Sequence, residues 1–203
     1  MEARARERGL RRLKATVEPD DVVLDAFVRR AGFTQRGEVL RMWRVLNGPV
    51  AEPAWPGGVR VRTFEDGDAR PVQTLLDEAY AGWDDTYVPR PPDEWLQWMT
   101  GHDEFDPALW FLVERGGELV ACALHWKEQE RRGWLKDIVV RAKERGAGLG
   151  RALVEQGLHA YAQRGVERVG LKVDSANPTV AFRLYERAGF VVDRQYGAWV
   201  KDL

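Results

Sequence analysis

The chain has 203 residues, 44% of them apolar, which is enough for one large domain with a buried core, or for one domain plus a fragment. Its 31 basic and 32 acidic residues leave a net charge of −1, so composition gives no basic field that would attract nucleic acid. No apolar run is long enough to cross a bilayer and the charged N-terminus lacks a signal-peptide core, so we expect a cytoplasmic protein.

The start of the chain is rich in basic side chains. Glutamates and leucines are interleaved with them, which favours a solvated helix face over a nucleic-acid-binding arm. The basic residues concerned are Arg4, Arg6, Arg8, Arg11, Arg12 and Lys14.

Residues 59–141 predict a strand, two helices and a three-stranded meander. Apolar alternation and helical spacing indicate the first elements, and turn residues separate the others. In chain order we expect a strand at 59–63, a helix through Val72, Leu75, Leu76 and Ala79, an aromatic and acidic loop at 83–89, a short helix opened by Pro91-Pro92, strands at 109–114 and 119–127 joined by a turn, and a strand at 134–141.

A glycine-rich turn follows the meander at residues 145–150, Arg-Gly-Ala-Gly-Leu-Gly. It precedes a helix expected from Leu149 to about Gln163, which would bury Leu149, Ala152, Leu153, Gln156 and Ala160 on one face. Backbone N–H groups that converge at the positive end of a helix favour a bound pyrophosphate. A glycine turn that binds nothing is the alternative.

The remaining residues predict a strand at 169–173, a loop at 174–178, a helix that ends at Ala188-Gly189 and a final hairpin over 190–203. Together with the earlier elements they make an α/β sheet of mixed strand directions. The single cysteine, Cys122, lies in an apolar run and is interpreted as a core residue rather than a nucleophile. His102, His125 and His159 are scattered, so we predict no metal site.

Two motifs in this order resemble the GNAT superfamily of acetyl-CoA-dependent N-acyltransferases. One is Arg145-x-x-Gly148-x-Gly150 after a strand, and the other is Asn177 followed by Leu184-Tyr185 and the helix end Gly189-Phe190. The resemblance covers roughly residues 59–203. It implies the GNAT fold, a mixed, mainly antiparallel central sheet flanked by helices.

The resemblance also implies how an acetyl-CoA donor would be held. Ile138, Val139 and Val140 would pair their backbone with the pantetheine arm, and a backbone N–H of this strand would polarise the thioester carbonyl. Asn177 would hold the cofactor arm or the splay of the strands, with capping of the next helix as a compatible role. The pyrophosphate would lie on the backbone of the loop residues Arg145, Gly146, Ala147, Gly148, Leu149, Gly150 and Arg151.

Tyr185 matches the position of the family's general acid, which protonates the departing thiolate. Without the motif, Tyr185 would be interpreted as an aromatic residue on a buried helix face. The resemblance thus implies that Tyr185 contacts the cofactor and acts in catalysis.

The general base is less directly indicated, because Trp134 stands where several members of the family carry a glutamate. Asp137 lies on the same strand with the opposite alternation, so it would face the cleft only if a bulge redirects it. Asp84 and Asp85, in the first loop, or a bound water are the alternatives. In that loop Trp83 and Tyr87 are the best candidates for contacting an acceptor, whereas most other tryptophans are expected to pack in the core.

The first fifty residues repeat the end of the chain. Residues 9–17 parallel 165–173, and 27–33 parallel 184–190, with Val28 where Tyr185 stands. We interpret residues 1–50 as the C-terminal β-α-β-β half of a second, inert GNAT-like domain without a cofactor loop, 51–58 as a linker and 59–203 as the complete domain. The uncovered half predicts packing on the complete domain or on a second chain, as in a homo-oligomer.

These features predict an acetyl-CoA-dependent N-acetyltransferase that transfers an acetyl group to an amine of a small molecule or protein by direct transfer in a ternary complex. The alternative is a catalytically silent acyl-CoA-binding sensor or assembly module. Neither reading requires a nucleic acid, a membrane or a metal as partner.

Overall fold

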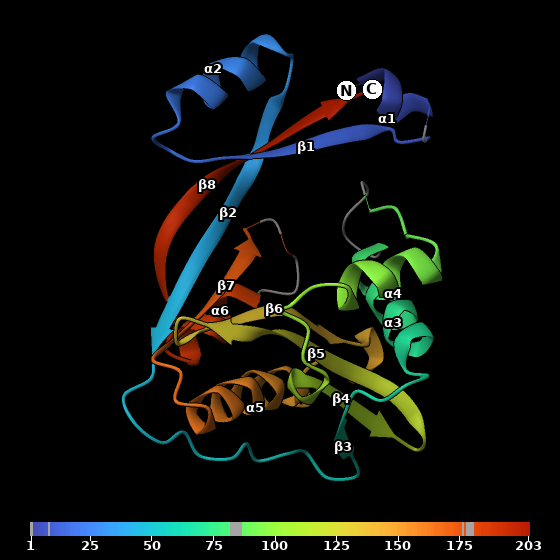
Figure 1. Cartoon of the computed structure of the whole chain (residues 1–203), viewed down its shortest axis with the longest axis vertical. Helices are drawn as coiled ribbons and strands as arrows, with labels where there is room; N and C mark the ends of the chain where they lie inside the picture. The colour runs from blue at the N-terminus through green and yellow to red at the C-terminus, as the bar shows by residue number, and fades with distance from the viewer. Residues whose placement is uncertain (1, 8, 82–86, 176, 178–180) are drawn as a thin grey trace.

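The computed structural model describes residues 2–7, 9–81, 87–175, 177 and 181–203. One eight-stranded sheet, in the order β1-β8-β2-β7-β6-β5-β4-β3, runs through the described residues (Figure 1). The strands are β1 Arg12–Val17, β2 Thr34–Val45, β3 Arg60–Thr63, β4 Trp110–Arg115, β5 Glu118–Gln129, β6 Arg132–Val140, β7 Arg168–Asp174 and β8 Val191–Asp202. The α-helices are α1 Glu2–Glu7, α2 Val22–Arg30, α3 Ala69–Ala81, α4 Pro92–Thr100, α5 Leu149–Gln163 and α6 Ala181–Arg187.

Strands β4 to β6 form the three-stranded antiparallel meander that the sequence predicts, and β3, which is predicted as a separate strand, pairs with β4. Each pairs with the next, and β4 and β5 are joined by Gly116-Gly117, both with positive φ. Because glycine adopts that conformation without strain, the turn is local and the hairpin register follows from it. Strand β6 then pairs in parallel with β7, so the sheet is mixed but mainly antiparallel.

Two helices cover each face of this part of the sheet. Helices α5 and α6 pack on one face, and α3 with α4 packs on the other (Figure 1). The bounds predicted for the long helix are confirmed by α5, but its buried stripe differs, because Gln156 and Ala160 are only partly buried. Helix α5 crosses several strands and buries a wider face than one stripe, including Val154, Leu158 and Tyr161.

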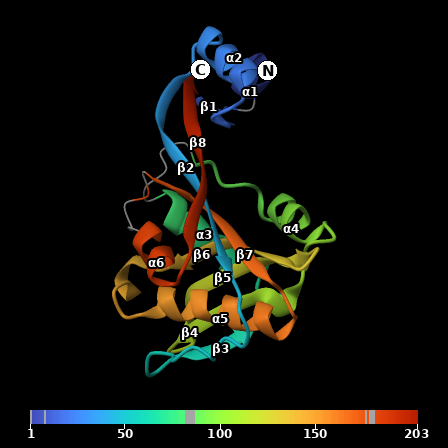
Figure 2. The same cartoon turned by 90° about the vertical axis from the view of Figure 1, so that its left-hand side faces the viewer.

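The hairpin predicted for residues 190–203 is wrong, because these residues form one long strand. Strand β8 pairs with β2 on one side and with β1 on the other, and Figure 2 shows β2 and β8 running together along the molecule. Register shifts between Gln35 and Gly37 and between Arg41 and Met42 mark bulges in this pair. Bulges let two long strands pair and twist over their whole length without a turn. The alternation of apolar and polar residues in such a strand resembles that of a hairpin.

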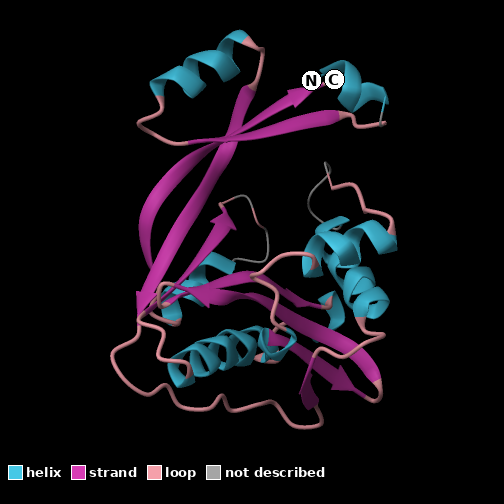
Figure 3. Ribbon diagram, viewed as in Figure 1, coloured by secondary structure: helices cyan, strands magenta, loops and turns pink. Residues whose placement is uncertain are grey.

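The first fifty residues also contain one long strand, β2, where the sequence predicts a hairpin, and this expectation is wrong as well. Their strand-helix-strand order, β1-α2-β2, repeats that of β7-α6-β8, and the two units exchange strands: β2 pairs with β7, and β8 pairs with β1 (Figure 3). A small cluster of Val17, Val28 and Trp199 holds α2 on the exchanged strands. Residues 1–50 therefore join the sheet of residues 59–203 within one chain.

Candidate active site

The parallel pairing of β6 with β7 stops half-way along both strands. It runs from Arg132 opposite Arg168 to Leu135 opposite Leu171 and ends there. Beyond this point a cavity of about 910 Å³ lies between the strands, lined by residues 136–140 of β6 and 172–174 of β7. The edge of β6 at Ile138, Val139 and Val140 faces this cavity, so an extended molecule can lie along it as an added strand would.

The glycine loop forms one end of the cavity. Gly146 and Gly148 have positive φ, of 81° and 87°, and Gly148 is the N-cap of α5 with no side-chain cap. The first N–H groups of α5 are therefore left for a ligand, at the positive end of the helix. The lining includes Arg145, Gly146, Gly148, Leu149, Gly150 and Arg151, whereas Ala147 is not among the lining residues.

Asp137 faces this cavity because β6 carries a bulge. Leu124 pairs with Asp137 and His125 pairs with Leu135, so Lys136 is the extra residue. The extra residue reverses the alternation, and Trp134 and Asp137 consequently both lie on the face covered by α3. The sequence predicts that Asp137 faces the cleft only if a bulge redirects it, and β6 contains such a bulge.

Two donors hold the Asp137 carboxylate, which is 8% exposed. The hydroxyl of Tyr80, on α3, donates to Oδ1, and the ammonium of Lys136 donates to Oδ2 at 3.0 Å. Burial, followed by the charge of Asp137, raises the pKa of Tyr80, so this phenol stays a donor. Sequence reasoning missed Tyr80, because it follows the apolar stripe of α3 and belongs to no motif.

The loop after α3 reaches the same group through Tyr87. Its ring stacks on that of Tyr80, with centroids 5.3 Å apart, and its hydroxyl donates to Asp77. Tyr87 therefore supports Tyr80 from the segment that leads to α4. The other residues predicted for this loop, Trp83, Asp84 and Asp85, lie outside the described residues.

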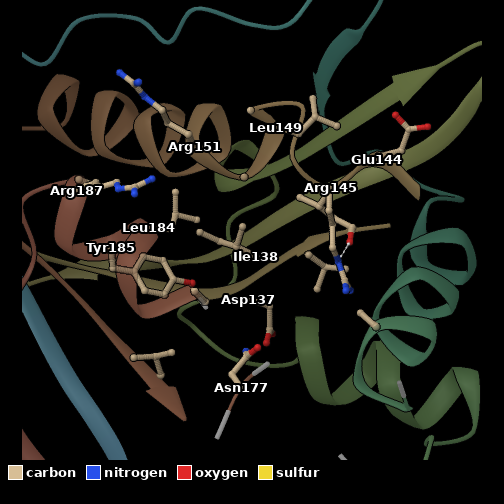
Figure 4. A pocket seen from close by; sticks show the side chains of 18 of the residues that line it. Asp137, Ile138, Glu144, Arg145, Leu149, Arg151, Asn177, Leu184, Tyr185 and Arg187 are labelled. Carbon is tan, nitrogen blue, oxygen red and sulfur yellow. Dashed lines mark hydrogen bonds between the residues drawn. The ribbon is translucent and has the colours of Figure 1, made fainter. Parts of the chain in front are cut away.

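Tyr185 and Asn177 line the cavity on its β7 side. Figure 4 shows the Tyr185 hydroxyl pointing into the cavity, where the Asp137 carboxylate also lies. Burial raises the pKa of Tyr185, and the charge of Asp137 raises it further. The phenol therefore keeps its proton and is available as a donor to a group bound in the cavity.

Cys122 is fully buried in the cluster between the sheet and α3, and burial raises the pKa of its thiol. A protonated, inaccessible thiol is a poor nucleophile, which agrees with its interpretation as a core residue. Within the described ranges no three His, Cys, Asp or Glu side chains gather as a metal site would require. None of the described helices is both long and apolar enough to span a membrane.

The chain is similar in sequence to known acetyltransferases. The model of the acetyltransferase (GNAT) family matches residues 71–190. A mycothiol acetyltransferase of Thermobispora bispora is 38% identical over 174 residues, covering 78% of this chain and 55% of that protein. A mycothiol acetyltransferase of Thermomonospora curvata is 33% identical over 91% of this chain and 62% of its own length. The chain thus spans somewhat more than half the length of these curated relatives.

Solved structures show the same fold. A GCN5-related N-acetyltransferase from Sphaerobacter thermophilus superposes with a TM-score of 0.77 at 30% identity, covering 94% of this chain and 59% of that one. A tandem GNAT protein from the clavulanic acid biosynthesis pathway superposes with a TM-score of 0.68 at 20% identity, covering 98% and 66%. The family model spans more than half of the chain, and this chain therefore belongs to the GNAT acetyltransferase family.

Proposed function

We propose that this chain transfers an acetyl group from acetyl-CoA to a primary amine by direct attack in a ternary complex. The observation that carries the proposal is the split between β6 and β7, which opens a cavity containing the glycine loop, Asp137 and Tyr185 together. One cavity thus offers a place for an extended donor, a carboxylate and a neutral phenol.

The residues present fit the donor. The uncapped N-terminus of α5 would hold the pyrophosphate, and the free edge of β6 would pair with the pantetheine arm. At about 910 Å³ the cavity lies at the upper end of the range for cofactor sites, roughly 300–1,000 Å³. A glycine at 146 and 148 keeps the loop backbone open to phosphate oxygens.

The acceptor amine must lose a proton before or during its attack. A carboxylate has about four lone-pair positions, and Tyr80 and Lys136 each occupy one, on different oxygens of Asp137. The remaining positions let Asp137 accept the amine proton. As the C–N bond forms and the C–S bond breaks, the departing thiolate takes the proton of the Tyr185 hydroxyl. A backbone N–H of β6 would polarise the carbonyl.

A silent acyl-CoA-binding module is the other candidate, and Trp134 favours it because an indole cannot accept a proton. The bulge at Lys136 weakens this argument, since it brings the Asp137 carboxylate to the same face three residues further along β6. The two candidates differ in turnover and not in donor binding.

The test is release of free CoA thiol from acetyl-CoA across a panel of amines, with a calorimetric titration of acetyl-CoA on the same preparation. The panel includes the acceptor of the mycothiol acetyltransferases, which are the curated relatives. Release that one class of amine stimulates supports the enzyme. Tight binding without stimulated release supports the silent module, and absence of binding refutes both. A cytoplasmic location remains the expectation from the sequence.

A further inference from the structure

The two strands exchanged between the repeated units each bring a basic side chain to a helix of the other unit. On β2, the guanidinium of Arg44 donates to the carbonyl of Ala188 at 2.6 Å, just after α6. On β8, the ammonium of Lys201 donates to the carbonyl of Ala31, just after α2. Each exchanged strand thus contacts the C-terminal end of the helix that belongs to the other unit.

The two contacts occupy equivalent positions in the repeat. Arg44 is the register partner of Val169 on β7, and Lys201 is the register partner of Leu13 on β1. Leu13 and Val169 stand at the same position of the segment that is repeated in the sequence. The basic contact is therefore part of the exchanged-strand arrangement in both units.

Both helices end in the same way, at a glycine with positive φ. Gly189 after α6 has a φ of 82°, and Gly32 after α2 has a φ of 79°. The last carbonyls of a helix have no partner within it and carry partial negative charge. A basic side chain that bonds one of these carbonyls fixes the end of the helix and is favoured by its dipole.

Helix α6 depends strongly on such contacts, because it is short. It has 7 residues, all of them described, and none of these is buried. Tyr185 lies three residues before Ala188, on the same side of the helix. Its backbone carbonyl accepts from the N–H of Phe190 at 3.0 Å, while its hydroxyl points into the cavity (Figure 4). Arg44 therefore holds the turn of helix that carries the Tyr185 hydroxyl.

Strand β2 also contacts the segment that leads to α6. The N–H of Glu38 donates to Oγ of Ser175 at 3.1 Å, and the N–H of Ser175 donates to the Glu38 carbonyl at 2.9 Å. Asn177, two residues further along the chain, lines the cavity. One strand from residues 1–50 is thus bonded to the cavity wall near Asn177 and again near Tyr185.

We propose that Arg44 is a positioning residue for the Tyr185 hydroxyl, so that residues 1–50 contribute to catalysis through β2. This inference rests on the proposed acetyl transfer. Arg44 is not among the residues that line the cavity, and it acts by fixing the end of α6. The equivalent contact of Lys201 holds α2, which supplies no residue to the cavity, and therefore has no such effect.

The first test is the kinetics of Arg44→Met, which removes the donor and keeps a long side chain. We expect kcat to fall about 3- to 10-fold, the size of one lost interaction with a helix end. The acetyl-CoA Kd should stay within about 2-fold, because the donor contacts proposed for the loop and β6 do not involve α6. Arg44→Lys, which keeps a cationic donor, should recover most of the loss. Lys201→Met removes the equivalent contact from α2 and is the matched control.

Combination with Tyr185→Phe distinguishes positioning from a general loss of stability. In the Tyr185→Phe background, Arg44→Met should have no further effect on kcat, because the hydroxyl that Arg44 positions is absent. An equal fall in kcat in both backgrounds would overturn the proposal, and so would the same fall in Lys201→Met.

A measurement without turnover separates failure of positioning from failure of acetyl transfer. In protein labelled with 3-fluorotyrosine, the ¹⁹F resonance of Tyr185, assigned with Tyr185→Phe, should shift when acetyl-CoA is added. In Arg44→Met this shift should change, and in Lys201→Met it should not. That pattern without amine-stimulated release of CoA would refute the transfer and support the positioning. The same shift in Arg44→Met as in the wild type would overturn the positioning.

A second pair of variants covers the case in which Arg44→Met does not fold. Gly189→Ala strains the turn that Arg44 contacts, since a Cβ at this φ of 82° is unfavourable and would lie 3.7 Å from Cδ of Arg44. Gly32→Ala strains the equivalent turn after α2. Gly189→Ala should lower kcat and change the Tyr185 resonance, whereas Gly32→Ala should do neither. Equal effects of the two variants would overturn the proposal.

Discussion

The hydroxyl of Tyr80 donates a hydrogen bond to the carboxylate of Asp137, joining helix α3 to the bulged strand β6. The bulge turns Asp137 toward the helix, and Tyr80 then fixes the direction of the carboxylate within the cavity. The second oxygen is held by Lys136, the bulged residue itself. A carboxylate held in this way needs little reorientation before it accepts a proton, which is the condition for an efficient general base.

Replacement of Asp137 by asparagine should remove the proposed general base while keeping the size of the side chain. We expect kcat to fall about 10²- to 10⁴-fold, the usual contribution of general acid–base catalysis. The acetyl-CoA Kd, measured by calorimetry, should stay within about 2-fold, since the donor contacts proposed for the loop and strand are backbone groups. Asp25→Asn, at an exposed ion pair with Arg29 on α2, is the control. Wild-type turnover in Asp137→Asn would leave Asp84, Asp85 or a bound water as the candidates for the base.

Tyr80→Phe should act through Asp137 and not by itself. It removes one hydrogen bond and leaves the ring packed, so kcat should fall about 10-fold while KM for the amine changes little. Tyr87→Phe removes the neighbouring hydroxyl, which bonds to Asp77, and should leave kcat within about 2-fold. A double-mutant cycle with Asp137→Asn measures the dependence. If Tyr80→Phe lowered kcat as much in the Asp137→Asn background as in the wild type, Tyr80 would not be a positioning residue for Asp137.

Tyr185→Phe tests the proposed role of Tyr185 as the general acid. Turnover should fall about 10²-fold with acetyl-CoA affinity nearly unchanged, because the phenol matters only as the thiolate leaves. The pKa of Tyr185 is raised above the ordinary tyrosine value of about 10, so the group stays protonated through pH 10. The pH–rate profile of the wild type should accordingly show no decline in rate below pH 10 that is absent from the profile of Tyr185→Phe. Such a decline would mean that Tyr185 titrates in this range and does not have the buried environment described.

The local elements could be predicted from the sequence, because the signals that define them are local. Each element is determined within a few residues. The signals are the alternation of apolar and polar residues, the Gly116-Gly117 turn and the glycine N-cap of α5, which has no side-chain cap. The two long strands β2 and β8 could not be predicted from the sequence, because their partner strands come from opposite ends of the chain. A 12-residue strand with bulges shows the same alternation as a hairpin, and only pairing in space distinguishes them.

The residues of the candidate site also divide into those that could be predicted from the sequence and those that could not. The loop 145–151 and Tyr185 belong to motifs that are continuous in sequence, so they could be named beforehand. Asp137 required a bulge at Lys136, which changes side-chain direction without any special residue to announce it. Tyr80 reaches the site by tertiary packing from α3, and no pattern around it indicates a function.

Gly148→Ala should weaken acetyl-CoA binding. Its φ of 87° is costly for any residue with a Cβ, by roughly 1–2 kcal/mol, and the loop would change conformation to relieve the strain. The expected result is a Kd about 10-fold higher by calorimetry. Gly165→Ala is a matched control at the other end of α5, because it has a φ of 72° and open space around it. It should lower the free energy of unfolding similarly without changing the Kd. Equal loss of binding in both variants would show a general effect of destabilisation.

His125 should make the stability of the protein depend on pH. The side chain is fully buried beneath α5, where a Cβ at Gly157 would lie 2.5 Å from its Nε2, and burial lowers its pKa to about 4. In the unfolded chain the pKa is about 6.5, so the unfolded state binds the proton more readily. The free energy of unfolding should therefore be highest above pH 6.5 and fall by about 3 kcal/mol as the pH decreases to 4, at 1.36 kcal/mol per pKa unit. Urea unfolding across this range measures the slope. His125→Gln should flatten this slope whatever its effect on absolute stability, and a slope that persists in His125→Gln would assign it to other groups.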